Sequence, residues 1–191
     1  TGTDLSAGRV VGLTAFVSAI FLQRTGIVGK FLENMGTQNV VLVLILTMAL
    51  GALIGLINGF CVSKFKLHPF IVTLSTQLIT YGTYLTLSNA SQISNLDPSY
   101  TTNLVTRTLF RVQTSPTPTY VQVPVYVLLA VIVTIVMWFI WNKTAFGKNM
   151  FAVGSNEDAA RVSGVNVTLT IIGVFALAGA MYGYTGFVEA A

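Results

Sequence analysis

The sequence predicts an all-α fold, a polytopic transmembrane helix bundle with about five membrane segments. Hydrophobic residues make up 53% of the chain and charged residues only 8%, whereas soluble domains carry about 25% charged residues. Four windows contain no Asp, Glu, Lys or Arg: 34–63, 67–96, 112–142 and 162–188. Each can cross a hydrocarbon core about 30 Å thick, because a helix rises about 1.5 Å per residue. Membrane lipid is therefore the expected solvent, and residues 1–191 are expected to form a single transmembrane domain.

The first predicted helix, 5–23, contains a short apolar run of 13 residues, 10–22. That length favours a half-span, a re-entrant piece or the tail of a truncated helix. The polar, glycine-flanked stretch before it is typical of an interrupted helix, in which Thr3 or Asp4 would cap the new segment. At membrane depth Asp4 would be functional, whereas at the surface it would only be a cap. Because the chain opens without an initiator methionine and stops directly after an apolar run, we expect it to belong to a longer protein.

Two predicted helices, 40–62 and 165–188, carry small residues at helical spacing. In the first helix Gly51, Gly55 and Gly59 share one face with Asn58. The second helix shows the same kind of spacing with four small residues: Ala176, Gly179, Ala180 and Gly183. Small side chains allow two membrane helices to approach closely, so both helices are predicted to lie inside the bundle. Packing is the favoured interpretation over a direct role in transport.

The helix predicted at 69–87 is the most polar of the long spans. Thr73, Gln77, Thr80 and Tyr84 fall on one stripe at helical spacing. Such groups need partners inside a bilayer, so the stripe should face the bundle interior or a wet path. Hydrogen bonding between helices is one interpretation, and a path for a neutral polyol is the other. The candidate translocation path comprises Asp4, Ser6, Asn58, Thr73, Gln77, Thr80 and Tyr84.

The last connection leads from a helix predicted at 121–141 to the segment 154–164. Aromatic residues mark both ends of that helix, as is typical of membrane interfaces. If all five helices cross, the connections 63–68 and 142–164 share a side that is denser in Lys and Arg, which predicts that this side is cytoplasmic. The loop 88–120 would lie on the opposite side, where it could meet an external partner or form an ordinary surface loop.

The segment 154–164 reads GSNEDAARVSG and is predicted to be a short cytoplasmic helix. Ser155 or Asn156 can cap it, Glu157 and Asp158 suit the positive end of its dipole, and Gly164 suits the left-handed turn that ends it. A charged helix between two uncharged spans is a docking element for a soluble partner, with a polar loop as the alternative. The candidate coupling residues are Gly154, Asn156, Glu157, Ala160, Ser163 and Gly164.

Composition excludes several other classes of function. With one histidine, one cysteine and no close carboxylate pair, the chain cannot assemble a metal site or a catalytic triad, so no enzyme activity is expected. No Walker-type glycine-rich loop is present, so no nucleotide cofactor is expected in this chain. The net charge of +4 comes from single Lys and Arg residues in loops, which fits membrane flanks and not a nucleic-acid surface.

Three motifs in order resemble one family of transporters. They are TGTDLSAGR (1–9), LINGFCVSKFKLHPFIVTLST (56–76) and WNKTAFGKNMFAVGSNEDAARVSGVNV (141–167). Together they are similar to the permease subunits of ribose/galactose-type ABC sugar importers, and most similar to the members that carry galactose and methyl galactosides.

The resemblance implies a multi-pass permease in the bacterial cytoplasmic (inner) membrane. It would work as a homodimer with a second permease copy, an ABC ATPase subunit that binds ATP, and a periplasmic sugar-binding protein. Segment 154–164 would be the coupling helix that seats on the ATPase. The expected function is import of a monosaccharide, galactose or a methyl galactoside, with ribose as an alternative within the family.

Other classes of membrane protein remain open on the residues alone. An ion-coupled secondary transporter or channel would need buried ionisable groups, for which Asp4 is the candidate. An integral-membrane enzyme would need an acid, base or metal constellation that the chain lacks. A structural anchor is the remaining alternative.

Overall fold

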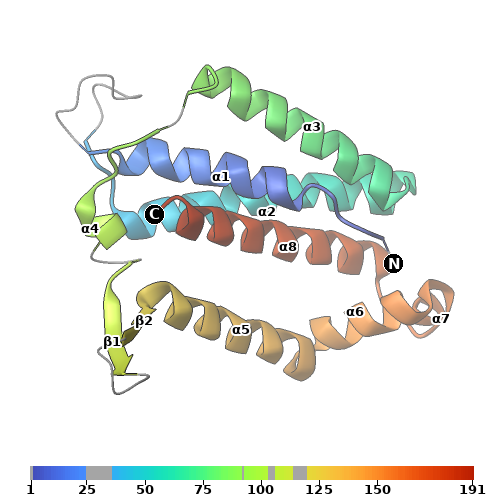
Figure 1. The fold of residues 1–191 in the computed structure, drawn as a ribbon. Coiled ribbons are helices and arrows are strands. Elements are labelled where there is room, and N and C mark those ends of the chain that lie inside the picture. Colours follow the sequence, from blue (N-terminus) through green and yellow to red (C-terminus); the bar gives the residue numbers. More distant parts are fainter. Residues whose placement is uncertain (1, 25–35, 92, 103–105, 114–119) are drawn as a thin grey trace.

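The computed structural model describes residues 2–24, 36–91, 93–102, 106–113 and 120–191. Their elements follow one another as α1 (Ala7–Leu22), α2 (Val40–Phe65), α3 (Pro69–Ser88), α4 (Pro98–Tyr100), β1 (Thr108–Gln113), β2 (Tyr120–Pro124), α5 (Val125–Lys143), α6 (Ala145–Ser155), α7 (Glu157–Val162) and α8 (Val167–Glu189). The long helices lie side by side along one direction (Figure 1). The predicted helix bundle is confirmed.

The centre of the bundle is the pair formed by α2 and α8. A methyl group on Gly51 would overlap the carbonyl oxygen of Gly179, and one on Gly183 would overlap the carbonyl oxygen of Thr47. The two backbones therefore touch at positions where the sequence supplies no side chain, as the glycine spacing predicted. α1 packs against α8 in the same manner, because Gly186 lies against the backbone of α1. These contacts fix α1, α2 and α8 relative to one another.

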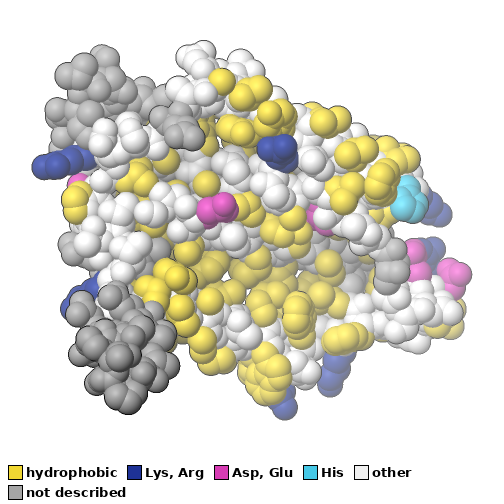
Figure 2. All heavy atoms as spheres, viewed as in Figure 1, with side chains coloured by type: hydrophobic (Ala, Val, Ile, Leu, Met, Phe, Trp, Pro, Cys, Tyr) yellow, Lys and Arg dark blue, Asp and Glu magenta, His cyan; other side chains and the backbone are white. Residues whose placement is uncertain are grey.

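The outward surface of the long helices is apolar. Figure 2 shows hydrophobic side chains spread over the bundle between its two ends. By length and composition, α2, α5 and α8 can each cross a membrane. α3 has 20 residues but is not among these candidates, so within the described residues the expectation of four such spans is met by three. Its hydroxyl and amide side chains lower the mean hydropathy. α1, with 16 residues, is a shorter apolar helix, as predicted.

The stretch before α5 folds differently from the prediction. We expected a helix from residue 121, but residues 120–124 form β2, which pairs antiparallel with β1. α5 therefore begins at Val125, directly after Pro124. β-branched residues and a proline in 120–124 favour an extended backbone over a helix. The short α4 and β1 lie in the predicted loop 88–120, whereas most of β2 falls in the helix predicted at 121–141.

Different connecting segments lie at the two ends of the bundle. The amino terminus, the α2–α3 connection and the α6–α7 connection lie at one end, whereas α4, β1 and β2 lie at the other (Figure 1). This arrangement agrees with the alternation of loops that the sequence predicted. Part of the long loop between α3 and α5 falls outside the described residues.

Candidate translocation and coupling site

An extended backbone segment lies inside the bundle just before α1. The amide of Leu5 donates to the Thr73 hydroxyl at 3.1 Å, and that hydroxyl also donates to the carbonyl of Thr3 at 3.4 Å. Residues 3–5 therefore run alongside α3 and not beyond its end. Non-helical backbone at membrane depth occurs where it is buried in protein or lines a cavity. That the segment interrupts a longer helix stays a prediction.

Asp4 ties this segment to α8. One carboxylate oxygen accepts the amide of Ser6 at 2.8 Å and its hydroxyl at 2.6 Å, and the other oxygen accepts the Tyr182 hydroxyl at 3.1 Å. The prediction that Thr3 or Asp4 is the N-cap of the first helix is wrong. The N-cap is Ser6, which makes no side-chain cap bond, because its hydroxyl donates to Asp4 instead.

Asn58 joins three helical elements at one buried point. Its side chain is 1% exposed. The amide nitrogen donates to the Ser6 hydroxyl at 3.4 Å, and the amide oxygen accepts the Thr76 hydroxyl at 2.6 Å. Asn58 lies seven residues before the end of α2 and Thr76 seven residues after the start of α3, which places the contact about 10 Å inside the bundle.

The structure brings together four of the seven candidate path residues and separates the rest. Asp4, Ser6 and Asn58 are joined by side-chain hydrogen bonds, and Thr76 extends this polar network. Thr73 lies beside it and bonds to the backbone of the segment before α1. The remaining candidates lie further along α3: Gln77, Thr80 and Tyr84. Of these, Thr80 bonds within its own helix, to the carbonyl of Thr76 at 2.8 Å.

Two members of the network were missed by the sequence analysis. Thr76 was left off the stripe, although it follows Thr73 at a spacing of three residues, which was the available signal. Tyr182 carried no comparable signal. Its hydroxyl reaches Asp4 across 178 positions of sequence, and that pairing exists only after the chain has folded.

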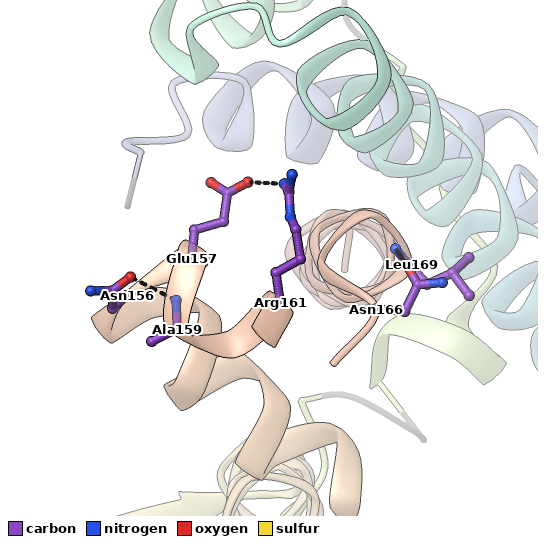
Figure 3. Close-up of polar contacts among 6 residues, drawn as sticks. All are labelled: Asn156, Glu157, Ala159, Arg161, Asn166 and Leu169. Atoms are coloured by element: carbon purple, nitrogen blue, oxygen red, sulfur yellow. Dashed lines mark hydrogen bonds and ion pairs between the residues drawn. The ribbon is translucent and has the colours of Figure 1, made fainter. Parts of the chain in front are cut away.

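At the end of the bundle that holds the amino terminus, α7 forms a short helix with both ends defined. Asn156 is its N-cap, and the side-chain oxygen accepts the amide of Ala159 at 3.0 Å (Figure 3). Gly164 has φ +82° and begins the turn toward α8. Asn166 then caps α8 by accepting the amide of Leu169 at 3.0 Å. Few residues therefore separate two capped helices.

The predicted segment 154–164 is not a single element. Gly154 and Ser155 belong to the last turn of α6, and α7 begins only at Glu157. Asn156 has an extended backbone with ψ 110°, so it cannot continue α6 as a helix. Of the two N-cap candidates, Asn156 is correct and Ser155 is wrong. The candidate coupling residues lie on α6, at the junction of α6 and α7, on α7 and in the turn that follows.

α7 presents charge to solvent and one small side chain to the protein. Glu157 and Arg161 pair at 3.1 Å on its exposed face. Ala160 is 3% exposed and faces inward, whereas Val162 is 90% exposed. Ser163 donates its hydroxyl to the carbonyl of Ala159 at 2.9 Å and so closes the last turn. The helix is therefore anchored by one face and leaves the other free for a partner.

The described residues contain no group of three or more His, Cys, Asp or Glu side chains placed to hold a metal ion. The network at Asn58 instead offers hydroxyl, amide and carboxylate groups. Such groups exchange hydrogen bonds with polar, uncharged molecules. The arrangement can therefore bind a polar, uncharged molecule through hydrogen bonds.

Comparison with known proteins gives consistent matches along the whole chain. A family model described as the permease component of the branched-chain amino acid transport system matches residues 1–191. The galactose/methyl galactoside import permease of Salmonella typhimurium is 42% identical over 99% of this chain and 55% of the relative. The corresponding permease of Haemophilus influenzae is 37% identical over 99% of this chain and 55% of the relative.

A more distant relative is the ribose import permease of Escherichia coli, which is 31% identical over 100% of this chain and 53% of the relative. The chain spans about half the length of the curated relatives it matches. No solved structure matches it. The resemblance to ribose/galactose-type permeases is confirmed, and with three apolar helices that can cross a membrane the protein is a multi-pass membrane protein. The chain belongs to the family of permease components of the branched-chain amino acid transport system.

Proposed function

We propose that this chain forms the transmembrane path of an ATP-driven importer for a monosaccharide, galactose or a methyl galactoside. The identity of 42% to an import permease for galactose and methyl galactoside supports that substrate class. The alternative within the family is another sugar such as ribose, at 31% identity. The importer would act in the bacterial cytoplasmic membrane and take up the sugar from the outside.

The observation that carries the proposal is the position of α7. This capped helix stands at one end of the bundle, exposes the Glu157–Arg161 face and is joined to α8 by a short turn. A soluble ATPase that binds to this face could move α7. The caps at Asn156 and Asn166 would keep the ends of α7 and α8 helical, so that a displacement of α7 would also displace α8. ATP would bind to that partner subunit and not to this chain.

The movement of α7 would be transmitted to the polar network through α8. α8 is in backbone contact with α2 at Gly179 and bonds to Asp4 through Tyr182. A shift of α8 would therefore change the spacing between Asp4, Ser6 and Asn58, which hold the extended segment. Such groups can replace the hydrogen bonds that the sugar hydroxyls make with water. The sugar would bind to them weakly and could therefore be released.

Two further partners complete the proposed importer. A periplasmic sugar-binding protein would dock at the end that holds α4, β1 and β2, opposite to α7 (Figure 1). A second copy of the permease would supply the other wall of the path.

The test is sugar uptake by the full-length permease, reconstituted in liposomes with its ATPase and binding protein. We expect galactose uptake that requires ATP hydrolysis and persists after an ionophore dissipates the proton gradient. Uptake of ribose in preference to galactose would assign the alternative sugar. Uptake that collapses with the gradient while ATP is held constant would contradict the proposal and favour an ion-coupled transporter that uses Asp4.

A further inference from the structure

A guanidinium group lies over an aromatic ring at the contact between α1 and α3. The Arg9 Cζ atom is 4.1 Å from the centroid of the Tyr81 ring. Arg9 is exposed and belongs to the first helical turn of α1. Among the described residues Arg9 forms no ion pair, and its side chain donates no hydrogen bond. Its five N–H groups are thus available to a ligand.

The contact between Arg9 and Tyr81 lies well between the two ends of α3. Tyr81 lies twelve residues after Pro69, the first residue of α3, and twelve residues of helix span about 18 Å. In a hydrocarbon core about 30 Å thick, that position is near the middle. A charged side chain at this depth faces water or protein, because exposure to lipid is costly. Figure 2 shows basic and acidic side chains on the face that α1 and α8 present, between the two ends of the bundle.

Aromatic rings extend the surface around Arg9. The Tyr81 and Tyr84 centroids are 5.5 Å apart with an interplanar angle of 66°, and Phe16 of α1 lies 6.3 Å from Tyr84. Both tyrosines are half-buried, and among the described residues neither hydroxyl forms a hydrogen bond. Apolar ring surface next to a few free polar groups is the composition of a small-molecule site.

This surface continues the polar network along α3. Tyr84 lies eleven residues after Thr73, which is three helical turns and therefore the same face. The surface is thus displaced from Asn58 and Thr73 toward the end that carries α4, away from α7. A molecule that enters from that end would meet the rings before it meets the extended segment.

We propose that Arg9, Tyr81 and Tyr84 form a binding subsite for a neutral monosaccharide at mid-membrane depth, an inference that rests on the proposed function. A pyranose has an apolar C–H face that fits an aromatic ring and a rim of hydroxyl groups that accept from guanidinium and phenol donors. The stack on Tyr81 fixes the guanidinium, so its fork of donors is oriented before the sugar arrives.

The first experiment compares variants of the full-length permease in the reconstituted importer. Arg9→Gln and Tyr84→Phe should each lower galactose uptake about tenfold, as expected for the loss of a hydrogen bond in a charged or buried site. ATPase activity of the complex should remain. Tyr126→Phe is the matched control, because Tyr126 lies on α5, away from α1 and α3, and should retain the parent's uptake. Parental uptake by both Arg9→Gln and Tyr84→Phe would overturn the subsite.

A second experiment does not depend on transport. In the full-length permease with Cys61→Ser, the variant Tyr84→Cys is treated with a water-soluble methanethiosulfonate reagent, with and without galactose. We expect labelling that saturating galactose slows and L-glucose does not. A thiol that resists the reagent but crosslinks to a second permease copy would overturn the proposal by making this face a subunit interface.

The two experiments separate the subsite from the proposed function. If the parent importer takes up no sugar but galactose still slows labelling, the proposed function fails and the subsite stands. If uptake is normal and no sugar affects labelling, the subsite fails and the proposed function stands.

Discussion

Replacing Asn58 with leucine should destabilise the permease by about 2 kcal/mol. Its side chain is 1% exposed, so water cannot replace the two hydrogen bonds that it makes. The bond to Thr76 is 2.6 Å long and the bond to Ser6 is 3.4 Å long. Hydrogen bonds between membrane helices contribute about 0.6 kcal/mol on average and up to about 1.7 kcal/mol, so the short bond should be near the upper value and the long bond near the lower.

The bond between Asn58 and Thr76 can be isolated by a double-mutant cycle. Thr76→Val keeps the shape of the side chain and removes the donor, and it should cost about 1.5 kcal/mol alone. Combined with Asn58→Leu, it should add little, which gives a coupling energy of about 1.5 kcal/mol. The assay is denaturant unfolding of the full-length permease in micelles. Ser75→Ala is the control, because Ser75 is exposed and its hydroxyl bonds within α3. Additive effects, within about 0.3 kcal/mol, would refute the assignment of a shared buried bond.

Three further predictions concern packing, capping and pH. Gly179→Leu should abolish folding of the permease in the membrane, since any side chain there meets the backbone of α2, whereas Gly82→Leu, with open space around it, should yield parental amounts of folded protein. Asn156→Ala should cost α7 about 1 kcal/mol and speed hydrogen exchange of the amide bonded to it about fivefold. Hydrogen bonds from the hydroxyl and amide of Ser99 hold the pKa of Asp97 below its ordinary value of 3.8. The stabilisation that Asp97 provides should therefore be present at neutral pH and be lost as the pH falls through that lowered pKa, so the difference in unfolding free energy between the parent and Asp97→Ala should close below about pH 3.8.

The bundle could be predicted because membrane helices leave strong local signals. Charge-free windows located α2, α5 and α8, and the spacing of Gly51 and Gly179 predicted which faces touch. The signal for the N-cap of α7 was also local, because the Asn156 side chain accepts a hydrogen bond from an amide only three residues away. In each case the physical cause lies within a few residues of sequence.

The parts that could not be predicted depend on contacts between distant segments. Tyr182 meets Asp4 only because α8 lies beside the segment before α1. Arg9 stacks on Tyr81 across the contact of α1 with α3, and neither residue stood out in the sequence. The hairpin of β1 and β2 was missed because β2 is continuous with the apolar helix predicted at 121–141, so its strand preference was hidden, and its partner β1 lies several residues away in a polar loop.

The central claim is that force from an ATPase enters through α7, and the ratio of sugar moved to ATP hydrolysed measures it most directly. In the reconstituted full-length importer, Glu157→Arg reverses a charge on the exposed face of α7. Glu189→Arg makes the same change at the other end of α8, where it is also exposed. We predict that the ratio falls about tenfold or more in Glu157→Arg, because a misplaced charge opposes docking, and stays at the parent's value in Glu189→Arg. A parental ratio in Glu157→Arg would contradict the account.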